Sequence, residues 1–268
     1  MKEARPITGV LLDISGVLLI DGRAVPGAAD AIAQLIDFGL PYRFATNTTR
    51  RPPVAMVRRL NEAGIAADEA SVFSAPRAAK DFIAARGLRP WLLVHPELRD
   101  HFAGLAAETP DASDAVLVGD AGDGFTYAAM NQAFNVLMNS GGPLLAMGVN
   151  RYFRHGDGAL ALDAGPFVRA LEDGAGITAQ VLGKPARAFF EAAATEMGVA
   201  LDGLAMIGDD VRDDVGGAQA HGLVGVLVRS GKYTDGDEGR IDPPPAACVR
   251  DIREAVACIL ERTRSASA

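Results

Sequence analysis

The stretch GVLLDISGVL, residues 9–18, joins an apolar run to one carboxylate, Asp13, and then to Gly16. The run with its β-branched content predicts a buried strand that ends at Asp13. Gly16 allows a tight turn that leaves the carboxylate uncovered. A carboxylate placed in this way can act as a nucleophile that forms an aspartyl phosphate, or it can bind a hard cation. It can also simply end a strand, because Asp is common in turns.

Three further predicted strands are followed by polar residues. The strand at residues 41–45 precedes Thr46-Asn47-Thr48-Thr49, and the strand at 179–182 precedes Gly183-Lys184-Pro185. The strand at 204–207 precedes Gly208-Asp209-Asp210, and Asp213 and Asp214 follow shortly after. In an open parallel sheet, ligands bind outside the carboxyl ends of the strands. We therefore expect a nucleophile, a hydroxyl, a lysine and an acidic cluster to meet there, and these groups suit phosphoryl transfer with magnesium.

The alternation of strands and helices predicts how the chain is organised. Strands alternate with helices from residue 7 to 74 and again from 179 to 259, which favours a parallel sheet. Helices are predicted at 28–38, at 53–63, after Pro185 and after Asp210, and a strand at 223–228. Residues 76–178 have their own alternation, with strands at 91–94, 115–118 and 144–147 and a helix at 127–138, and a block of this size is a folding unit rather than a loop.

We therefore predict an α/β protein with two domains. A Rossmann-like parallel sheet core would comprise residues 1–75 and 179–268, and a smaller α/β domain, residues 76–178, would be inserted into it. The net charge of −8 and the lack of a basic stripe argue against a nucleic-acid partner. The sequence has neither a long apolar signal core nor a run near the ~20 apolar residues of a membrane span, which predicts a cytoplasmic protein without a membrane partner. Cys248 and Cys258 are expected to be small apolar residues of a last helix.

The ordered set of four motifs resembles the haloacid dehalogenase superfamily over nearly the whole chain. The resemblance rests on DISG at 13–16, TNTT at 46–49, GKP at 183–185 and GDDVRDDVGGA at 208–218, and on GKY at 231–233 and PPP at 243–245. More narrowly, the chain resembles the branch with a large α/β cap, to which the phospholysine phosphohistidine inorganic pyrophosphate phosphatases belong. That branch places its cap between the second and third motifs, where residues 76–178 lie.

The resemblance and the chemistry of the residues together imply a Mg²⁺-dependent phosphatase. Asp13 would attack phosphorus and carry a transient aspartyl phosphate. Mg²⁺ would be held by the carboxylates of Asp13 and Asp209 and, as the resemblance implies, by the main-chain carbonyl of Ser15. Lys184 would hold the remaining negative charge of the phosphate, although a solvated loop lysine would also fit its sequence context.

The remaining roles concern substrate binding and orientation. Thr46 and the amide of Asn47 would donate hydrogen bonds to phosphate oxygens. Asp214, together with Asp210, would orient Lys184 or a metal-bound water from behind. Arg151, after a strand of the inserted domain, could pair with a second phosphate or a carboxylate of the substrate, or could simply be an exposed arginine. The resemblance is also compatible with a homodimer.

A second Gly-Asp sequence competes with the proposed metal motif. VGDAGD at 118–123 looks like IGDD at 207–210. Chain order favours Asp209 as the metal ligand, because its strand follows the Lys184 strand. Asp120 and Asp123 are expected to be turn and cap residues instead.

Ser15 departs from the pattern that the resemblance implies. Most phosphatases of the superfamily have Asp at this position, where it protonates the leaving oxygen and later activates water. A serine hydroxyl is a poor general acid, and a well-tuned acid is worth ~10²–10⁴ in rate. Ser15 therefore indicates either a weakly active enzyme or one specialised for labile donors, such as phosphohistidine, phospholysine or pyrophosphate. The alternative to an enzyme is a regulator that binds a small phosphorylated ligand without turnover.

Overall fold

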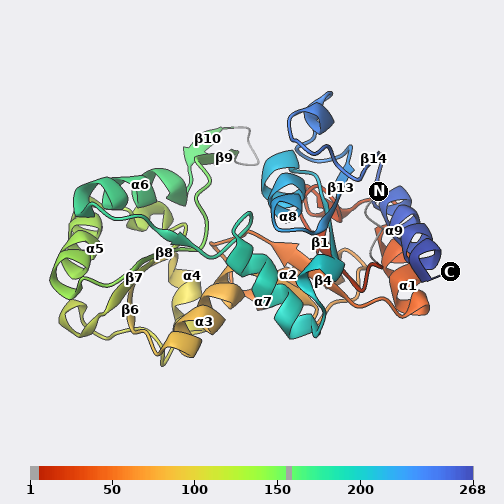
Figure 1. Cartoon of the computed structure of the whole chain (residues 1–268). Coiled ribbons are helices and arrows are strands. Elements are labelled where there is room, and N and C mark those ends of the chain that lie inside the picture. Colours follow the sequence, from red (N-terminus) through yellow and green to blue (C-terminus); the bar gives the residue numbers. More distant parts are fainter. Residues whose placement is uncertain (1–5, 155–158, 268) are drawn as a thin grey trace. The chain divides into compact units, whose positions relative to one another are not determined.

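The computed structural model describes residues 6–154 and 159–267, which form two compact units (Figure 1). The core unit comprises residues up to 46, residues 54–73 and residues from 184 onward. The inserted unit comprises residues 47–53 and 74–183. Relative to the boundaries expected from the sequence, residues 47–53 group with the inserted unit, and the second boundary falls at 183/184 rather than 178/179.

The core unit is built on a six-stranded sheet with β1 (Gly9–Asp13) near its centre. The strand order is β14 (Ala247–Val249), β13 (Val224–Val228), β12 (Leu204–Gly208), β1, β4 (Tyr42–Thr46) and β5 (Val72–Ser74). β1 pairs in parallel with β12 and with β4, and all five of its residues are buried. β1, β12 and β4 therefore end at the same edge of the sheet, as predicted, and bring Asp13, the residues after Gly208 and Thr46 to that edge.

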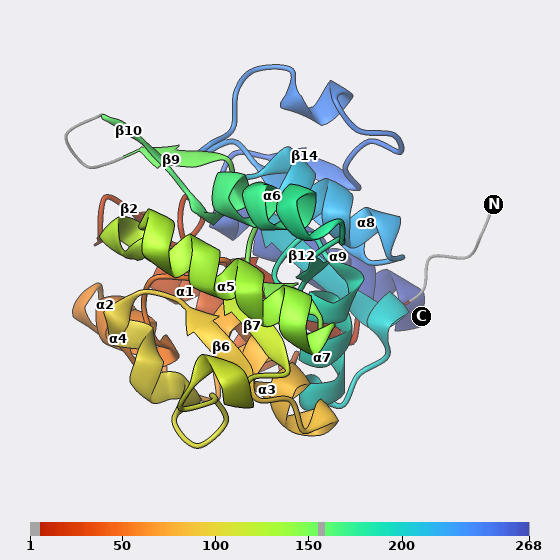
Figure 2. The same cartoon turned by 90° about the vertical axis from the view of Figure 1, so that its left-hand side faces the viewer.

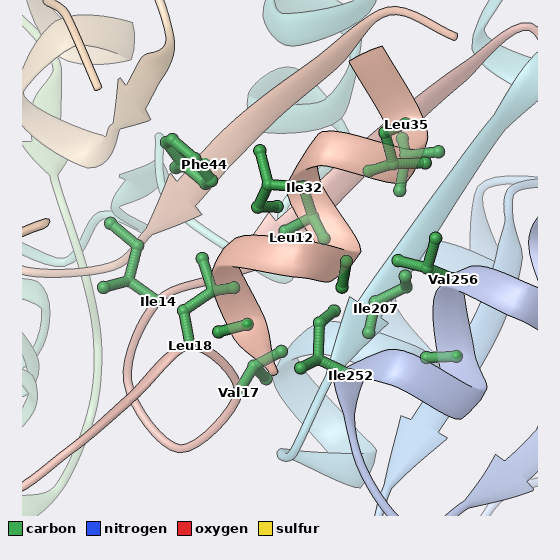
Figure 3. Close-up of a cluster of buried hydrophobic side chains, with 14 of the residues drawn as sticks. Leu12, Ile14, Val17, Leu18, Ile32, Leu35, Phe44, Ile207, Ile252 and Val256 are labelled. Atoms are coloured by element: carbon green, nitrogen blue, oxygen red, sulfur yellow. The ribbon is translucent and has the colours of Figure 1, made fainter. Parts of the chain in front are cut away.

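Helices pack on the face of this sheet that bears Leu12. α1 (Ala28–Phe38) and α9 (Ile252–Ser267) lie against this face, where Leu12 and Ile207 of the sheet share one apolar cluster with Ile32 of α1 and Val256 of α9 (Figure 3). α2 (Pro53–Glu62) adds Met56 and Leu60 to the same apolar cluster. Fully buried side chains of this kind supply most of the stabilisation of a domain.

Two further helices complete the core unit. α7 (Arg187–Met197) buries Phe189 and Phe190, and the ring centroid of Phe189 lies 5.0 Å from that of Phe73 in β5. The segment after β12 begins as a π-helix, Val211–Gly216, and continues as α8 (Gly217–Ala220), where the sequence predicted a single helix. A short hairpin is formed by β2 (Leu19–Ile20) and β3 (Arg23–Ala24).

The inserted unit has a four-stranded parallel sheet of its own. Its order is β11 (Gln180–Val181), β8 (Leu144–Ala146), β7 (Ala115–Val118) and β6 (Pro90–Leu93). The sequence predicted the strand of residues 179–182 to belong to the core sheet, but β11 pairs with β8 instead. Because of this pairing, Lys184 is the first residue of the chain's return to the core unit rather than the end of a core strand.

Helices and a hairpin complete the inserted unit. The helices are α3 (Ala75–Arg86), α4 (Pro96–Arg99), α5 (Tyr127–Ser140) and α6 (Ala164–Ala175), and the antiparallel hairpin is β9 (Tyr152–Arg154) with β10 (Leu160–Leu162). α5 and α6 lie side by side, and the rings of Phe125 and Phe167 stack at 3.8 Å between centroids (Figure 2). Short 3₁₀-helices occur at Asp100–Phe102, Pro110–Ala112, Gly122–Gly124, Leu201–Gly203 and Asp237–Gly239.

Within the described residues, no helix is both long enough and apolar enough to cross a bilayer. Cys258 lies in α9, whereas Cys248 lies in β14 and not in the last helix as expected; both are half-buried, and within the described residues neither forms a disulfide.

Candidate active site

Asp13 and Lys184 form a buried ion pair at the carboxyl end of β1. The ammonium Nζ of Lys184 lies 2.5 Å from Oδ1 of Asp13 and 2.6 Å from Oδ1 of Asp214. Lys184 is 3% exposed and Asp13 7% exposed. Charges this deeply buried require partners, and the lysine has one on each side. The two residues are 171 positions apart in the sequence, so the fold brings them together.

Asp209 and Asp214 complete an acidic cluster around this pair. Asp13, Asp209 and Asp214 each offer a carboxylate oxygen, and these three atoms lie within 4.8 Å of one another. The cluster is possible only because Gly208 has no side chain, since a Cβ there would lie 2.2 Å from Cβ of Asp214. β12 therefore ends in a glycine that lets the following π-helix place Asp214 against the strand end.

The electrostatics of the cluster favour an additional positive charge. Burial and the neighbouring charge of Asp13 raise the pKa of Asp209 to about 6. Burial also raises the pKa of Asp214 to about 8, against the lowering effect of Lys184. Burial alone would lower the pKa of Lys184, but the attraction of Asp13 and Asp214 outweighs it and raises this pKa. Three carboxylates share one ammonium, and an all-oxygen donor set with excess negative charge fits a hard divalent cation.

Asp210 stabilises the start of the π-helix. Its Oδ1 accepts hydrogen bonds from the amides of Arg212 and Asp213, both at 3.0 Å, and its Oδ2 lies 3.0 Å from Nζ of Lys232. Burial raises the pKa of Asp210, but the Lys232 charge and these donors outweigh it and hold the pKa below its usual value. Of the two residues expected to orient Lys184, Asp214 contacts it directly, and Asp210 caps the π-helix that carries Asp214.

The turn after β13 also reaches the cluster, which the sequence reasoning missed. The hydroxyl of Ser230 donates to the carbonyl of Gly16 at 2.6 Å. The amide of Lys232 donates to Oδ2 of Asp209 at 2.7 Å. Gly231-Lys232-Tyr233 entered the sequence analysis only as part of a family resemblance. Its residue types do not predict a hydrogen bond from a backbone amide.

The other candidates of the core edge lie at or near the ends of β1 and β4. Thr46 is buried at the end of β4, one residue beyond the register pair of Asp13 and Ala45. Asn47 is half-buried and opens the segment 47–53. Ser15 is exposed in the turn after β1, and Gly16 beside it has a φ of +87°. Gly16 has the left-handed conformation that the sequence predicted for the turn.

Asp120 has the turn role that the sequence favoured for it. Its carboxylate accepts a hydrogen bond from the amide of Gly122 at 2.9 Å and pairs with Nε of Arg50 at 3.3 Å. Its own amide donates to the hydroxyl of Thr49 at 3.0 Å. Asp120 and these partners all belong to the inserted unit, whereas Asp209 belongs to the core unit.

The inserted unit has a surface pocket of its own of about 400 Å³. It lies at the ends of β6 and β7, and its lining includes Arg50, Arg99, His95 and Trp91. Arg151, which the sequence singled out for substrate binding, is exposed just before β9 and does not line this pocket. Arg50 was missed, although it directly follows the Thr46–Thr49 motif.

Comparison with known proteins supplies an independent line of evidence. Residues 10–107 match the family model described as haloacid dehalogenase-like hydrolase, and residues 181–255 match a related model described as HAD-hydrolase-like. The chain is 40% identical over 261 residues to haloacid dehalogenase-like hydrolase domain-containing protein 2 of Mus musculus, covering 97% of this chain and 99% of that protein.

Two further comparisons cover the same length. The chain is 40% identical over 260 residues to the phospholysine phosphohistidine inorganic pyrophosphate phosphatase of Bos taurus, covering 95% of each chain. The solved structure of the p-nitrophenyl phosphatase from Archaeoglobus fulgidus shares the fold with a TM-score of 0.87 and 23% identity, over 94% of this chain and 99% of that one.

Proposed function

The chain belongs to the haloacid dehalogenase-like hydrolase family, and on that premise we propose that it is a phosphatase that acts through Asp13 on a small phosphorylated substrate. The observation that carries this proposal is the buried convergence of Asp13, Lys184, Asp209 and Asp214 at one edge of the core sheet. The phosphatase named among the relatives, 40% identical over 95% of the chain, supports the same reaction class.

The proposed reaction has two displacement steps at phosphorus. In the first, a carboxylate oxygen of Asp13 forms a bond to phosphorus while the bond from phosphorus to the leaving atom breaks with its electron pair. In the second, water attacks the phosphorus of the aspartyl phosphate, loses a proton to solvent, and displaces the Asp13 carboxylate as inorganic phosphate forms. Lys184 stays protonated throughout, since its pKa is raised, and offsets the charge of the phosphoryl group beside Asp13.

The acidic cluster would hold a divalent cation, for which Mg²⁺ is our proposal. Asp13 and Asp209 would supply carboxylate oxygens and Ser15 its main-chain carbonyl, in a donor set made only of oxygen. The bound cation would neutralise the repulsion between the Asp13 carboxylate and the phosphate oxygens. Asp214 would hold Lys184 in place through its 2.6 Å contact, and Thr46 and Asn47 would donate hydrogen bonds to the phosphate oxygens.

Ser15 points to substrates with good leaving groups. No carboxyl group stands two residues after the nucleophile, where a general acid would protonate an alkoxide. A nitrogen leaving group that is already protonated, or a phosphate leaving group, needs no such acid. This chemistry favours P–N bonds such as those of phosphohistidine and phospholysine, and the anhydride of pyrophosphate.

The test is release of inorganic phosphate from p-nitrophenyl phosphate, phosphohistidine and pyrophosphate, with and without Mg²⁺. We expect metal-dependent release by the unchanged protein and less than a few per cent of it from Asp13→Asn, whose amide is neither nucleophilic nor anionic. Turnover retained by a folded Asp13→Asn protein would contradict the assignment of Asp13. A protein that binds beryllofluoride with Mg²⁺ but releases no phosphate from any substrate would instead be the phospholigand-binding regulator.

A further inference from the structure

The turn formed by Ser230, Gly231 and Lys232 joins two parts of the chain that border the acidic cluster. On one side, the hydroxyl of Ser230 donates to the carbonyl of Gly16, in the turn that follows Asp13. On the other side, the amide of Lys232 donates to Oδ2 of Asp209. A three-residue segment therefore fixes both the turn after β1 and the carboxylate that follows β12.

The turn approaches Gly16 and Asp209 so closely that neither Gly16 nor Gly231 has room for a side chain. A Cβ on Gly231 would lie 1.9 Å from Oδ2 of Asp209 and 2.5 Å from Cα of Gly16. A Cβ on Gly16 would lie 1.9 Å from the same Asp209 oxygen. Gly16 and Gly231 both have positive φ, +87° and +58°, so neither their backbone conformation nor the space around them suits another residue.

The side chain of Lys232 connects the turn to Asp210. Its Nζ lies 3.0 Å from Oδ2 of Asp210, whose other oxygen accepts the two amides at the start of the π-helix. The turn is thus held at three points: the Gly16 carbonyl, the Asp209 carboxylate and the Asp210 carboxylate. Contacts that orient a ligating carboxylate affect how precisely it is placed.

The hydrogen bond to Asp209 limits how this carboxylate can bind a cation. Oδ2 accepts the Lys232 amide and is covered by Gly16 and Gly231 on its other side, so a cation would bind through Oδ1. Mg²⁺ binds oxygens at about 2.0–2.1 Å in near-octahedral geometry, whereas Ca²⁺ takes 6–8 oxygens at about 2.3–2.6 Å and often uses both oxygens of a carboxylate. A carboxylate that offers one oxygen suits Mg²⁺ better than Ca²⁺.

We propose that Ser230, Gly231 and Lys232 form a positioning clamp that restricts Asp209 to one-oxygen binding and so makes the site prefer Mg²⁺ over Ca²⁺. This inference rests on the proposed function, because it takes the cluster to be the cation site. The three residues act through Gly16 and Asp209 and touch no reacting atom. Weakening the clamp should therefore lower the preference for Mg²⁺ more than it lowers affinity for divalent cations in general.

The experiment measures Mg²⁺ and Ca²⁺ dissociation constants by calorimetry on the full chain without substrate. Ser230→Ala removes one hydrogen bond, and we expect it to weaken Mg²⁺ binding about 3- to 10-fold, the range that one hydrogen bond supplies, with a smaller change for Ca²⁺. Ser230→Thr keeps the hydroxyl and should restore most of the preference. Lys232→Gln, which breaks the contact with Asp210, should change the ratio in the same direction as Ser230→Ala.

Ser140→Ala is the matched control. The hydroxyl of Ser140 likewise donates to a main-chain carbonyl, that of Val136 at 2.7 Å, but within a helix of the inserted unit. Its Mg²⁺ to Ca²⁺ ratio should equal that of the unchanged protein. Circular dichroism and the melting temperature establish that each variant is folded.

The outcomes separate this proposal from the proposed function. An unchanged protein that binds Mg²⁺, together with unaltered ratios in both folded Ser230→Ala and folded Lys232→Gln, would overturn the clamp and leave the phosphatase proposal standing. An unchanged protein that binds no Mg²⁺ at all would overturn the cation site, and the clamp with it. A lower ratio in both variants, recovered in Ser230→Thr, is the result that we expect.

Discussion

Replacing Asp209 by Asn should stabilise the metal-free protein at alkaline pH, although Asp209 is a proposed metal ligand. Asp209 is 2% exposed, and burial and the charge of Asp13 raise its pKa to about 6, above the 3.8 of an unperturbed carboxyl. An amide removes this buried charge and keeps an oxygen that can accept the Lys232 hydrogen bond. The substitution therefore removes the free-energy cost of ionising Asp209 in the folded state.

The sign and size of the effect follow from the two pKa values. Below pH 3.8 the carboxyl is protonated in both the folded and the unfolded chain, so Asp209 carries no ionisation cost. As pH rises toward about 6, the unfolded chain loses this proton while the folded chain keeps it, and folding loses stability. The cost is about 1 kcal/mol at pH 4.5 and levels off at about 3 kcal/mol by pH 8, at 1.36 kcal/mol per unit of pKa difference.

The assay is urea unfolding of both proteins in EDTA at these two pH values. We expect Asp209→Asn to raise the free energy of unfolding by about 3 kcal/mol at pH 8 and by about 1 kcal/mol at pH 4.5. Added Mg²⁺ should stabilise the unchanged protein far more than the variant, since only the former has the full donor set. Asp209→Asn that destabilises the metal-free protein at pH 8, or that has the same effect at both pH values, would refute the reasoning.

Three other substitutions test separate parts of the structure. Asp209→Ala should raise the Mg²⁺ concentration needed for half-maximal phosphate release much more than Asp120→Ala does, because the hydrogen-bond partners of Asp120 lie in the inserted unit. Equal shifts in the two Mg²⁺ titrations would mean that the metal motif is not the one that contains Asp209. Ser15→Asp should raise the kcat/KM for an alkyl phosphate relative to that for phosphohistidine by ~10-fold or more, because only the alkoxide leaving group needs a proton. An unchanged ratio in a folded, Mg²⁺-binding protein would mean that residue 15 does not determine which leaving groups the enzyme prefers. Phe189→Ala should lower the free energy of unfolding in urea by about 3–5 kcal/mol, because this ring is fully buried against Phe73. A loss under about 1 kcal/mol would mean that neighbouring side chains move in to fill the cavity.

The parts of the fold that could be predicted from the sequence are those with a local signal. The strand that ends at Asp13, the helix at Ala28–Phe38 and the strand at Ala115–Val118 follow directly from apolar periodicity and flanking glycines. The strand at Gln180–Val181 was assigned to the wrong sheet. Its apolar pattern predicts a buried strand but contains no information on which sheet it joins, because pairing is a long-range property.

In the candidate site, too, some residues could be predicted from the sequence and others could not. Asp13, Lys184 and Asp209 were predicted because carboxylates and lysines after strands are chemically conspicuous, and their mutual distances are compatible with the predicted meeting. Ser230 and the amide of Lys232 were not predicted, because one contact uses a common hydroxyl and the other a backbone group that every non-proline residue has. The direct contact of Asp214 with Lys184 depends on a π-helical turn, which sequence periodicity does not signal.

The two sheets differ in whether neighbouring strands are also consecutive in the chain, and this difference affects when each unit can form during synthesis. β6, β7, β8 and β11 of the inserted unit pair in the order in which they leave the ribosome. At the centre of the core sheet, by contrast, the loop before β1 meets the loop before β12 through a hydrogen bond between Thr8 and Gly203, 195 residues apart. We expect the inserted unit to acquire structure first, while the edge of β1 that pairs with β12 stays unpaired until β12 has been synthesised. Ribosome-bound chains that end before residue 204 should therefore lack the partner of this edge of β1, although β6, β7, β8 and β11 are already complete.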